Sequence, residues 1–352
     1  MKNVTLLYYL KYGIQYEFKT ITDTLHNFYR RLYPSLDNIE DLIPDTKKRE
    51  LEQIYQKELD GIYLKCKDLE NTDAYKYYTN IVFPTLSHIE KNGIFVDRDL
   101  LYAYHPDYKI DIDPNDLIYS EYNVYTSTGR PSNRKGNINF AALKKDTGER
   151  SFIKSRFRDN GYLVEIDYEA YHLRLLSKIV GYEFPVGESP HQYLARYYNC
   201  DYEESKLITF KILYGGIPEE ATVIEFFKLV KDFTEKLYQE YEKNGKILSK
   251  IFKKDIFINS DNDKNFKNKL MNYYIQSYEF EFTITILQKV VEFMKMKKSK
   301  LILYTYDSIL LDMDKSEIKL LKNIINIMED NYFTVKIKYG KDYHNMVRFN
   351  TK

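Results

Sequence analysis

The sequence predicts a mixed α/β fold of the α+β kind, on three observations. Residues 162–167 form an apolar run typical of a buried strand, residues 301–313 form a hairpin pattern, and amphipathic helical segments surround both. With 352 residues, the chain is long enough for two or three packed units. Hydrophobic residues make up 43% and charged residues 30%, which excludes a disordered chain.

Composition also limits the class of protein. No apolar stretch approaches the ~20 residues that a bilayer span requires, and residues 1–10 lack the layout of a signal peptide, so we expect no membrane and a cytoplasmic location. Cys66 and Cys200 stand in no CxxC pair and predict neither a disulfide framework nor a zinc site. The net charge of +1 excludes a globally basic nucleic-acid binder, while 53 Lys and Arg residues allow a local basic groove.

The N-terminal part of the sequence reads as helical and then turns irregular. An amphipathic helix at 77–91 ends at Asn92-Gly93, a left-handed stop signal, and further helices are expected at 21–29 and 47–69. Residues 98–123, with two prolines, read as a loop. Residues 125–133 form a polar turn cluster whose Arg130 suits phosphate or sugar contacts.

Helices and strands alternate in the rest of the sequence. The strand at 162–167 is followed by expected helices at 173–180, 190–198, 202–214, 219–243 and 268–297. The hairpin joins 301–306 to 309–313, and a helix at 315–329 and a strand at 333–339 follow.

Two carboxylates stand at the ends of apolar strands, Asp167 after the first and Asp307 in the hairpin turn. If these strands pair in one sheet, the two aspartates meet. Two buried carboxylates with no obvious cationic partner repel each other, so we expect them to bind two Mg²⁺ ions, with Mn²⁺ as a substitute. Taken alone, these two residues are more simply interpreted as a turn aspartate and a strand-capping aspartate.

The helix at 202–214 favours the metal interpretation. Lys206, Phe210 and Tyr214 follow i, i+4, i+8 spacing and therefore lie on one helix face. A cation, a flat ring and a phenol in that order suit a triphosphate, a base and a sugar. His191, on the preceding helix, is a candidate second phosphate donor.

At this point the sequence resembles the family A DNA polymerases over residues 77–352. The resemblance consists of six motifs in chain order: Asn92-Gly-Ile-Phe-Val-Asp97; Thr126-Ser-Thr-Gly-Arg130-Pro-Ser with Asn137; Asp167-Tyr-Glu-Ala-Tyr-His172-Leu-Arg174 as motif A; Lys206-x3-Phe210-x3-Tyr214-Gly215 as motif B; Asn272-x3-Gln276; and Tyr306-Asp307-Ser308 as motif C. It implies a right-hand polymerase with an antiparallel-sheet palm and helical fingers.

The resemblance gives each matched residue a role. It implies that Asp167 and Asp307, with the backbone carbonyl of Tyr168, ligate the metals, and that Lys206 is catalytic and binds the triphosphate with His191. Phe210, Tyr214 and His172 would contact the incoming base and sugar. The residues implied to bind the primer-template are Arg130, Asn137, Gln276 and Arg174.

Three residues depart from the family pattern. Tyr202 stands where an Arg is expected, which removes one phosphate contact. His172 replaces the motif A Glu that blocks a ribose 2′-hydroxyl, and Ser308 replaces the motif C Glu. We expect His172 to keep the Tyr214 contact but to weaken sugar discrimination, and the remaining motif A frame still favours deoxynucleotides.

The resemblance also divides the chain. We expect a helical extension at 1–76 as a remnant of an exonuclease domain, the first part of the palm at 77–180, the fingers at 181–267 and the second part of the palm at 268–352. The thumb is reduced to about 25 residues and the exonuclease is absent, so grip on the duplex should be poor. A processivity protein, or a protein that supplies the exonuclease or thumb, is therefore an expected partner.

These observations favour a DNA-dependent DNA polymerase that extends a primer with nucleoside triphosphates. A primase or small single-subunit RNA polymerase is the first alternative, because of His172 and Ser308. A non-catalytic nucleic-acid-binding subunit is the second, because of the missing Arg and thumb, although two uncompensated aspartates bring such a subunit no benefit. The compact chain and a composition typical of an AT-rich genome suggest a virus or plasmid. If the source is viral, we expect the protein in the host cytoplasm.

Overall fold

A computed structural model of the chain describes residues 3–16, 44–108, 112–135, 138–258, 265–330 and 332–349. The expected helix at 21–29 and Asn137 lie outside the described residues. The chain divides into two compact units, Met1–Lys76 and Tyr77–Lys352. No helix in the described ranges has the length and apolar character needed to cross a bilayer.

The described part of the first unit is helical. It comprises α1 (Val4–Tyr12), α3 (Asp45–Cys66), a 3₁₀ turn (Lys67–Asn71) and the start of α4 (Asp73–Tyr77). The Asn3 side chain caps α1 by accepting a hydrogen bond from the Leu6 N–H at 3.0 Å, and α1 ends at Gly13 in the left-handed conformation. Since α1 packs on α3, this unit has its own helical contact.

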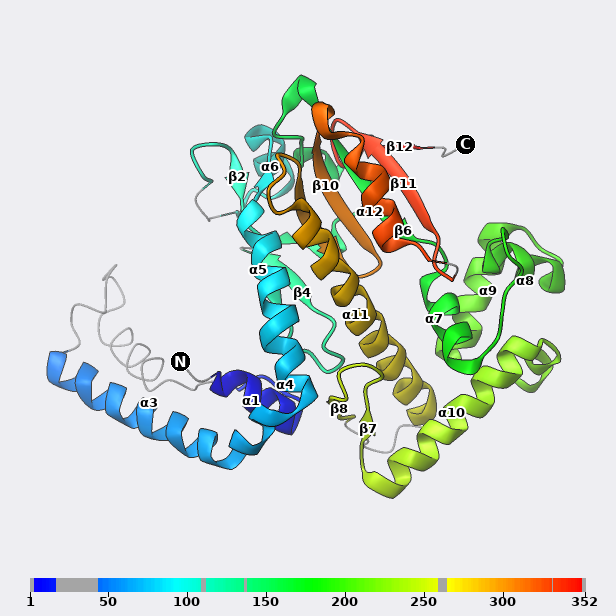
Figure 1. The fold of residues 1–352 in the computed structure, drawn as a ribbon, viewed down its shortest axis with the longest axis horizontal. Coiled ribbons are helices and arrows are strands. Elements are labelled where there is room, and N and C mark those ends of the chain that lie inside the picture. Colours follow the sequence, from blue (N-terminus) through cyan, green and yellow to red (C-terminus); the bar gives the residue numbers. More distant parts are fainter. Residues whose placement is uncertain are drawn as a thin grey trace. The chain divides into compact units, whose positions relative to one another are not determined.

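The second unit is built on a five-stranded antiparallel sheet with strand order β12-β11-β6-β10-β9 (Figure 1). Its central strand is buried on both faces, which explains the continuous apolar run in the sequence. The strands are β6 (Gly161–Tyr168), β9 (Lys300–Thr305), β10 (Ser308–Asp314), β11 (Val335–Gly340) and β12 (Val347–Arg348).

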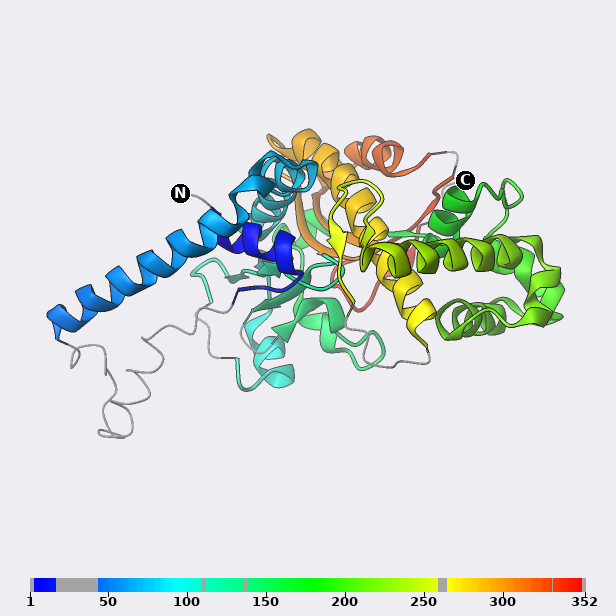
Figure 2. The same ribbon diagram turned by 90° about the horizontal axis from the view of Figure 1, so that it is seen from below.

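Helices cover one face of this sheet, and the segment from residue 94 to residue 160 covers the other (Figure 2). The helices are α5 (Phe83–Asn92), reached from α4 through a π-helical turn (Tyr78–Val82), α11 (Phe266–Met294) and α12 (Leu320–Met328), which a 3₁₀ turn (Lys315–Glu317) precedes. The long α11 is buried along most of its length, from Leu270 to Met294. It is therefore the main structural element of the helical layer.

The opposite layer consists of short elements around a shared apolar core. They are β1 (Ile94–Phe95), α6 (Arg98–Tyr104), β2 (Leu117–Ile118), β3 (Tyr122–Asn123), β4 (Ser132–Lys135), β5 (Ile138–Asn139) and 3₁₀ turns at Phe140–Ala142, Glu149–Phe152 and Arg158–Asn160. The expectation of loop throughout 98–123 is wrong, because the Asp97 side chain caps α6. That helix has seven residues.

Four helices extend from the end of β6 and return to α11. They are α7 (Tyr171–Val180), α8 (Pro190–Tyr198), α9 (Tyr202–Gly215) and α10 (Glu225–Asn244), which is joined to α11 by β7 (Ile247–Leu248) and β8 (Asp255–Ile256). Helix α10 begins later than the sequence predicts, since Glu219–Val223 after Pro218 forms a separate 3₁₀ turn. The buried Glu281 on α11 accepts the N–H groups of Ile251 and Phe252 and so fixes the β7–β8 loop.

A buried carboxylate joins the layers. Asp312 in β10 is fully buried and accepts hydrogen bonds from the Ser155 hydroxyl at 2.7 Å and from the Arg156 Nε at 2.9 Å. Arg156 also donates to the Gly93 carbonyl at 2.7 Å. Removal of one partner of such a pair leaves an uncompensated charge in the interior.

We therefore expect Asp312→Ala to lower the free energy of unfolding by about 3–5 kcal/mol in urea titrations. Glu235→Ala is the control, because Glu235 pairs with Lys267 at 2.7 Å on the exposed surface, and its loss should cost less than about 1 kcal/mol. Equal losses in the two variants would contradict the assignment of Asp312 as a structural anchor.

Candidate active site

The sheet brings Asp167 and Asp307 to the same end. Strands β6 and β10 pair so that Asp167 lies opposite Ser308, the residue directly after Asp307. Asp307 occupies a two-residue turn with Tyr306, whose φ of 63° is left-handed, and the Asp307 carbonyl accepts the Tyr168 N–H at 3.0 Å. The pairing expected from the sequence is therefore the one observed.

These two aspartates lie on the wall of a cavity of about 700 Å³ between the sheet and helices α7, α8, α9 and α11. Most of the site residues predicted from the sequence line it. They are Arg130, Asp167, Tyr168, His172, His191, Lys206, Phe210, Tyr214, Gln276 and Asp307. Arg174 does not line it, because its guanidinium donates to the backbone carbonyls of Glu169 and Tyr332 at 3.1 and 2.9 Å.

The carboxylates of Asp167 and Asp307 are held in an unfavourable environment. Burial, Asp307 and Glu165 raise the pKa of Asp167 to about 7, while burial and Glu279 raise the pKa of Asp307 above its usual range. From the sequence we expected no cationic partner for the two aspartates. This expectation is wrong in part, because the charges of Lys145 and Lys338 lower the pKa of Asp167 from a distance. In the described ranges, however, the Asp167 carboxylate makes no ion pair or hydrogen bond.

This environment fits divalent cations, since bound metal charge removes the repulsion between the carboxylates. No cluster of three or more acidic, histidine or cysteine side chains suited to a metal exists among the described residues. Mg²⁺ suits so sparse a set, because it commonly keeps several waters and binds through one or two carboxylates. Tyr168 offers only its backbone, since its phenol donates to the Met328 carbonyl at 3.0 Å.

Helix α9 presents Lys206, Phe210 and Tyr214 to the cavity, as their spacing predicts. The rings of Phe210 and Tyr214 are stacked, with centroids 5.8 Å apart. The buried His191 of α8 packs edge-on against Phe210 at 5.7 Å, so α8 and α9 form one wall. Lys206 has no ion pair among the described residues and is therefore available to an anion.

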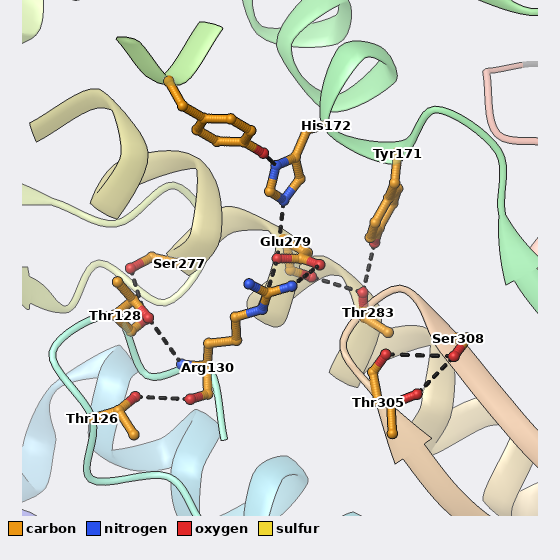
Figure 3. Close-up of polar contacts among 11 residues, drawn as sticks. Thr126, Thr128, Arg130, Tyr171, His172, Ser277, Glu279, Thr283, Thr305 and Ser308 are labelled. Atoms are coloured by element: carbon orange, nitrogen blue, oxygen red, sulfur yellow. Dashed lines mark hydrogen bonds and ion pairs between the residues drawn. The ribbon is translucent and has the colours of Figure 1, made fainter. Parts of the chain in front are cut away.

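A chain of polar contacts runs across the cavity through Glu279 (Figure 3). The His172 Nδ1 hydrogen-bonds the Tyr214 hydroxyl, and its Nε2 lies 3.0 Å from the Glu279 carboxylate. Arg130 donates to the same carboxylate at 3.1 Å and stacks over the Tyr306 ring at 3.7 Å. Burial raises the pKa of Glu279, but His172 and Arg130 together hold this pKa below its usual range.

The hydroxyls around Arg130 bind the protein itself. The Thr126 hydroxyl donates to the Arg130 carbonyl at 2.8 Å, and the Ser277 hydroxyl donates to the Thr128 carbonyl at 2.7 Å (Figure 3). The first bond closes the loop on itself, and the second ties the loop to α11. The Ser308 hydroxyl is likewise bonded to Thr305 at 2.7 Å, across the hairpin.

Sequence reasoning missed Glu279, Glu165 and the lysines of β11. A signal for Glu279 exists, since it is a charged residue among aromatic ones in Tyr278-Glu-Phe, one helical turn after Gln276. The alternation of Lys336 and Lys338 with apolar residues also places both lysines on one face of a strand. Both lysines line the cavity.

No family model matches the sequence, and no curated protein matches it either. Among solved structures, the chain is similar to the polymerase domain of Pol1 from M. smegmatis, solved in complex with a DNA primer-template and dNTP. The TM-score is 0.66 at 14% sequence identity, over 97% of this chain and 82% of that one. The fold therefore resembles that of a polymerase domain, and the mixed fold class with antiparallel sheets predicted from the sequence is confirmed.

The carboxylate pair predicts a measurable response to metal. Mg²⁺ or Mn²⁺ should stabilise the folded full chain by about 2.7 kcal/mol at a hundredfold excess over Kd, and its thermal midpoint should rise accordingly. Asp167→Asn should lose that shift and be no less stable without metal, because a repelling charge is gone. If Asp167→Asn kept the wild-type metal shift, the ion would lie elsewhere; Asp314→Asn, at a half-buried carboxylate at the other end of β10, is the control.

Proposed function

We propose that this protein is a template-directed nucleotidyltransferase, and specifically a DNA-dependent DNA polymerase that extends a primer. The observation that carries the proposal is the convergence, in one cavity, of the Asp167–Asp307 pair with Lys206 on α9. The polymerase-domain fold supports it. The order of the motifs along the sequence supports it as well.

In this proposal Asp167 and Asp307 hold two Mg²⁺ ions. When bound, the ions would activate a 3′-hydroxyl and stabilise the charge of leaving pyrophosphate. Lys206 and His191 bind the triphosphate, and Phe210 and Tyr214 pack on the incoming base and sugar. The residues of the chain act by positioning and by electrostatic stabilisation.

Arg130 and Gln276 are the proposed primer-template contacts, together with Asn137. Arg130 is held by Glu279, which sits one turn from Gln276 on α11, so both residues are positioned by the same helix. Arg174 has a different proposed role, because its donors already bind the carbonyls of Glu169 and Tyr332. It holds the backbone after β6 in place. The proposed palm comprises 77–180 and 268–352, and the fingers 181–267.

The structure bears on the RNA-synthesising alternative through His172. Both ring nitrogens are engaged, one by Tyr214 and one by Glu279, so neither is available to a ribose 2′-hydroxyl. An imidazole fixed in this way fills space beside the proposed sugar position. This arrangement favours deoxynucleotides as substrates, in contrast to the weaker sugar discrimination expected from the sequence.

Asp167→Asn and Asp307→Asn should each abolish primer extension by the full chain, because each removes a ligand of the proposed metals. The assay is extension of a labelled primer with dNTPs, and circular dichroism checks that the variants fold. Wild-type rates in either variant would contradict the proposed function. Loss in both variants with retained duplex binding excludes the non-catalytic alternative.

Sugar selectivity should depend on Glu279 as well as on His172. Glu279→Gln weakens the charge-assisted bond that fixes the imidazole, so ribonucleotide insertion should rise by about tenfold relative to dNTP insertion in single-turnover assays. His172→Glu alone sets two carboxylates against each other, and His172→Glu/Glu279→Gln removes that repulsion.

The double variant is therefore the informative one. It should discriminate against ribonucleotides at least as well as the wild type, since the introduced carboxylate offers the Tyr214 hydroxyl an acceptor in place of the imidazole. If neither Glu279→Gln nor His172→Ala changes the ratio of dNTP to rNTP insertion, the sugar is selected by another residue.

A further inference from the structure

Lys336 on β11 lies beside the proposed metal ligands. In the antiparallel pairing of β11 with β6, Lys336 is directly opposite Asp167. Residues opposite each other in such a pair project from the same face of the sheet. Both side chains line the cavity, so an ammonium group from the sheet enters the site next to a carboxylate.

The ammonium group of Lys336 is held at the N-terminal end of helix α9. Its Nζ lies 2.9 Å from the Tyr202 hydroxyl and 2.9 Å from the Glu169 carboxylate. Glu169 is shared, since Arg174 lies 4.0 Å from it and Thr334 donates to it at 3.3 Å. Glu169 therefore orients Lys336, but its carboxylate also contacts two other side chains.

The pKa of His191 indicates that the ammonium groups of Lys336 and Lys206 both act on the same imidazole ring. Burial and then the charges of Lys206 and Lys336 lower the pKa of His191 to about 4, so its imidazole is neutral at pH 7. The buried Nδ1 of His191 has no hydrogen-bond partner in the described ranges. A neutral ring with an unsatisfied nitrogen, within the influence of two cations, fits a polyanion.

We infer that Lys336 is a phosphate-binding residue that acts with Lys206, so that the incoming triphosphate is held by one lysine from the fingers and one from the palm sheet. The inference rests on the proposed function, which supplies the triphosphate. It also accounts for Tyr202, which presents no charge of its own but bonds a residue that does. Charge developing on the leaving phosphates is stabilised by such fixed cations.

The experiment compares Lys336→Gln, Lys336→Arg and Lys336→Gln/Tyr202→Arg in the full chain. Lys322→Gln is the matched control, because it removes the same charge from the exposed side of α12. Two readouts are used: the dNTP KM in primer extension, and the affinity for inorganic tripolyphosphate without DNA. Thermal midpoints and the Kd for primer-template are measured in parallel.

Lys336→Gln should raise the nucleotide KM and weaken tripolyphosphate binding by about tenfold or more, with the primer-template Kd unchanged. Lys336→Arg should stay within about threefold of wild type, and Tyr202→Arg should restore affinity to Lys336→Gln, because it returns a cation to the same place. Unchanged KM and tripolyphosphate affinity in Lys336→Gln would overturn the inference, as would an equal loss in Lys322→Gln.

The two proposals fail in different ways. If the wild-type chain does not extend primers, the proposed function fails, and tripolyphosphate binding still tests Lys336. If the wild type extends primers and Lys336→Gln merely lowers the thermal midpoint, the lysine is a structural partner of Glu169 and the inference alone is wrong.

Discussion

The pairing of β6 with β10 is the constraint on which the candidate site depends. It fixes Asp167 next to the turn that carries Asp307, and it does so at the end of a sheet whose central strand is buried. Burial and Asp307 raise the pKa of Asp167, burial and Glu279 raise the pKa of Asp307, and neither carboxylate gains a direct cation among the described residues. The free-energy cost is offset by the sheet, and a bound cation would remove it.

Glu279 is the second point on which the site depends. It is a buried carboxylate whose charge is balanced by Arg130 on one side and His172 on the other. Through these partners it joins α11 to the 126–130 loop, to α7 and, by way of Tyr214, to α9 (Figure 3). Four separate segments therefore share one compensated charge, and such a network loses more than one contact when any member is removed.

The cations of the cavity come from distant parts of the chain. Lys206 belongs to α9 and Lys336 to β11, and His191 of α8 lies within the influence of both charges. Lys336 faces the cavity only because β11 lies beside β6 in the register that sets it against Asp167. A shift of one residue would turn Lys336 to the helical face and bring Val335 or Ile337 into the cavity.

The sequence by itself determined the elements and the residues within one element. The apolar run of β6, the hairpin around Asp307 and the stripe Lys206–Phe210–Tyr214 follow from periods of 2 and 3.6 residues, which are local properties. Tertiary structure alone decided what meets across elements: Glu279 with His172 and Arg130, and Lys336 with Tyr202. The physical reason is that hydrogen bonds and ion pairs act over a few ångströms, whereas these partners stand 107 to 149 residues apart and meet only through packing and register.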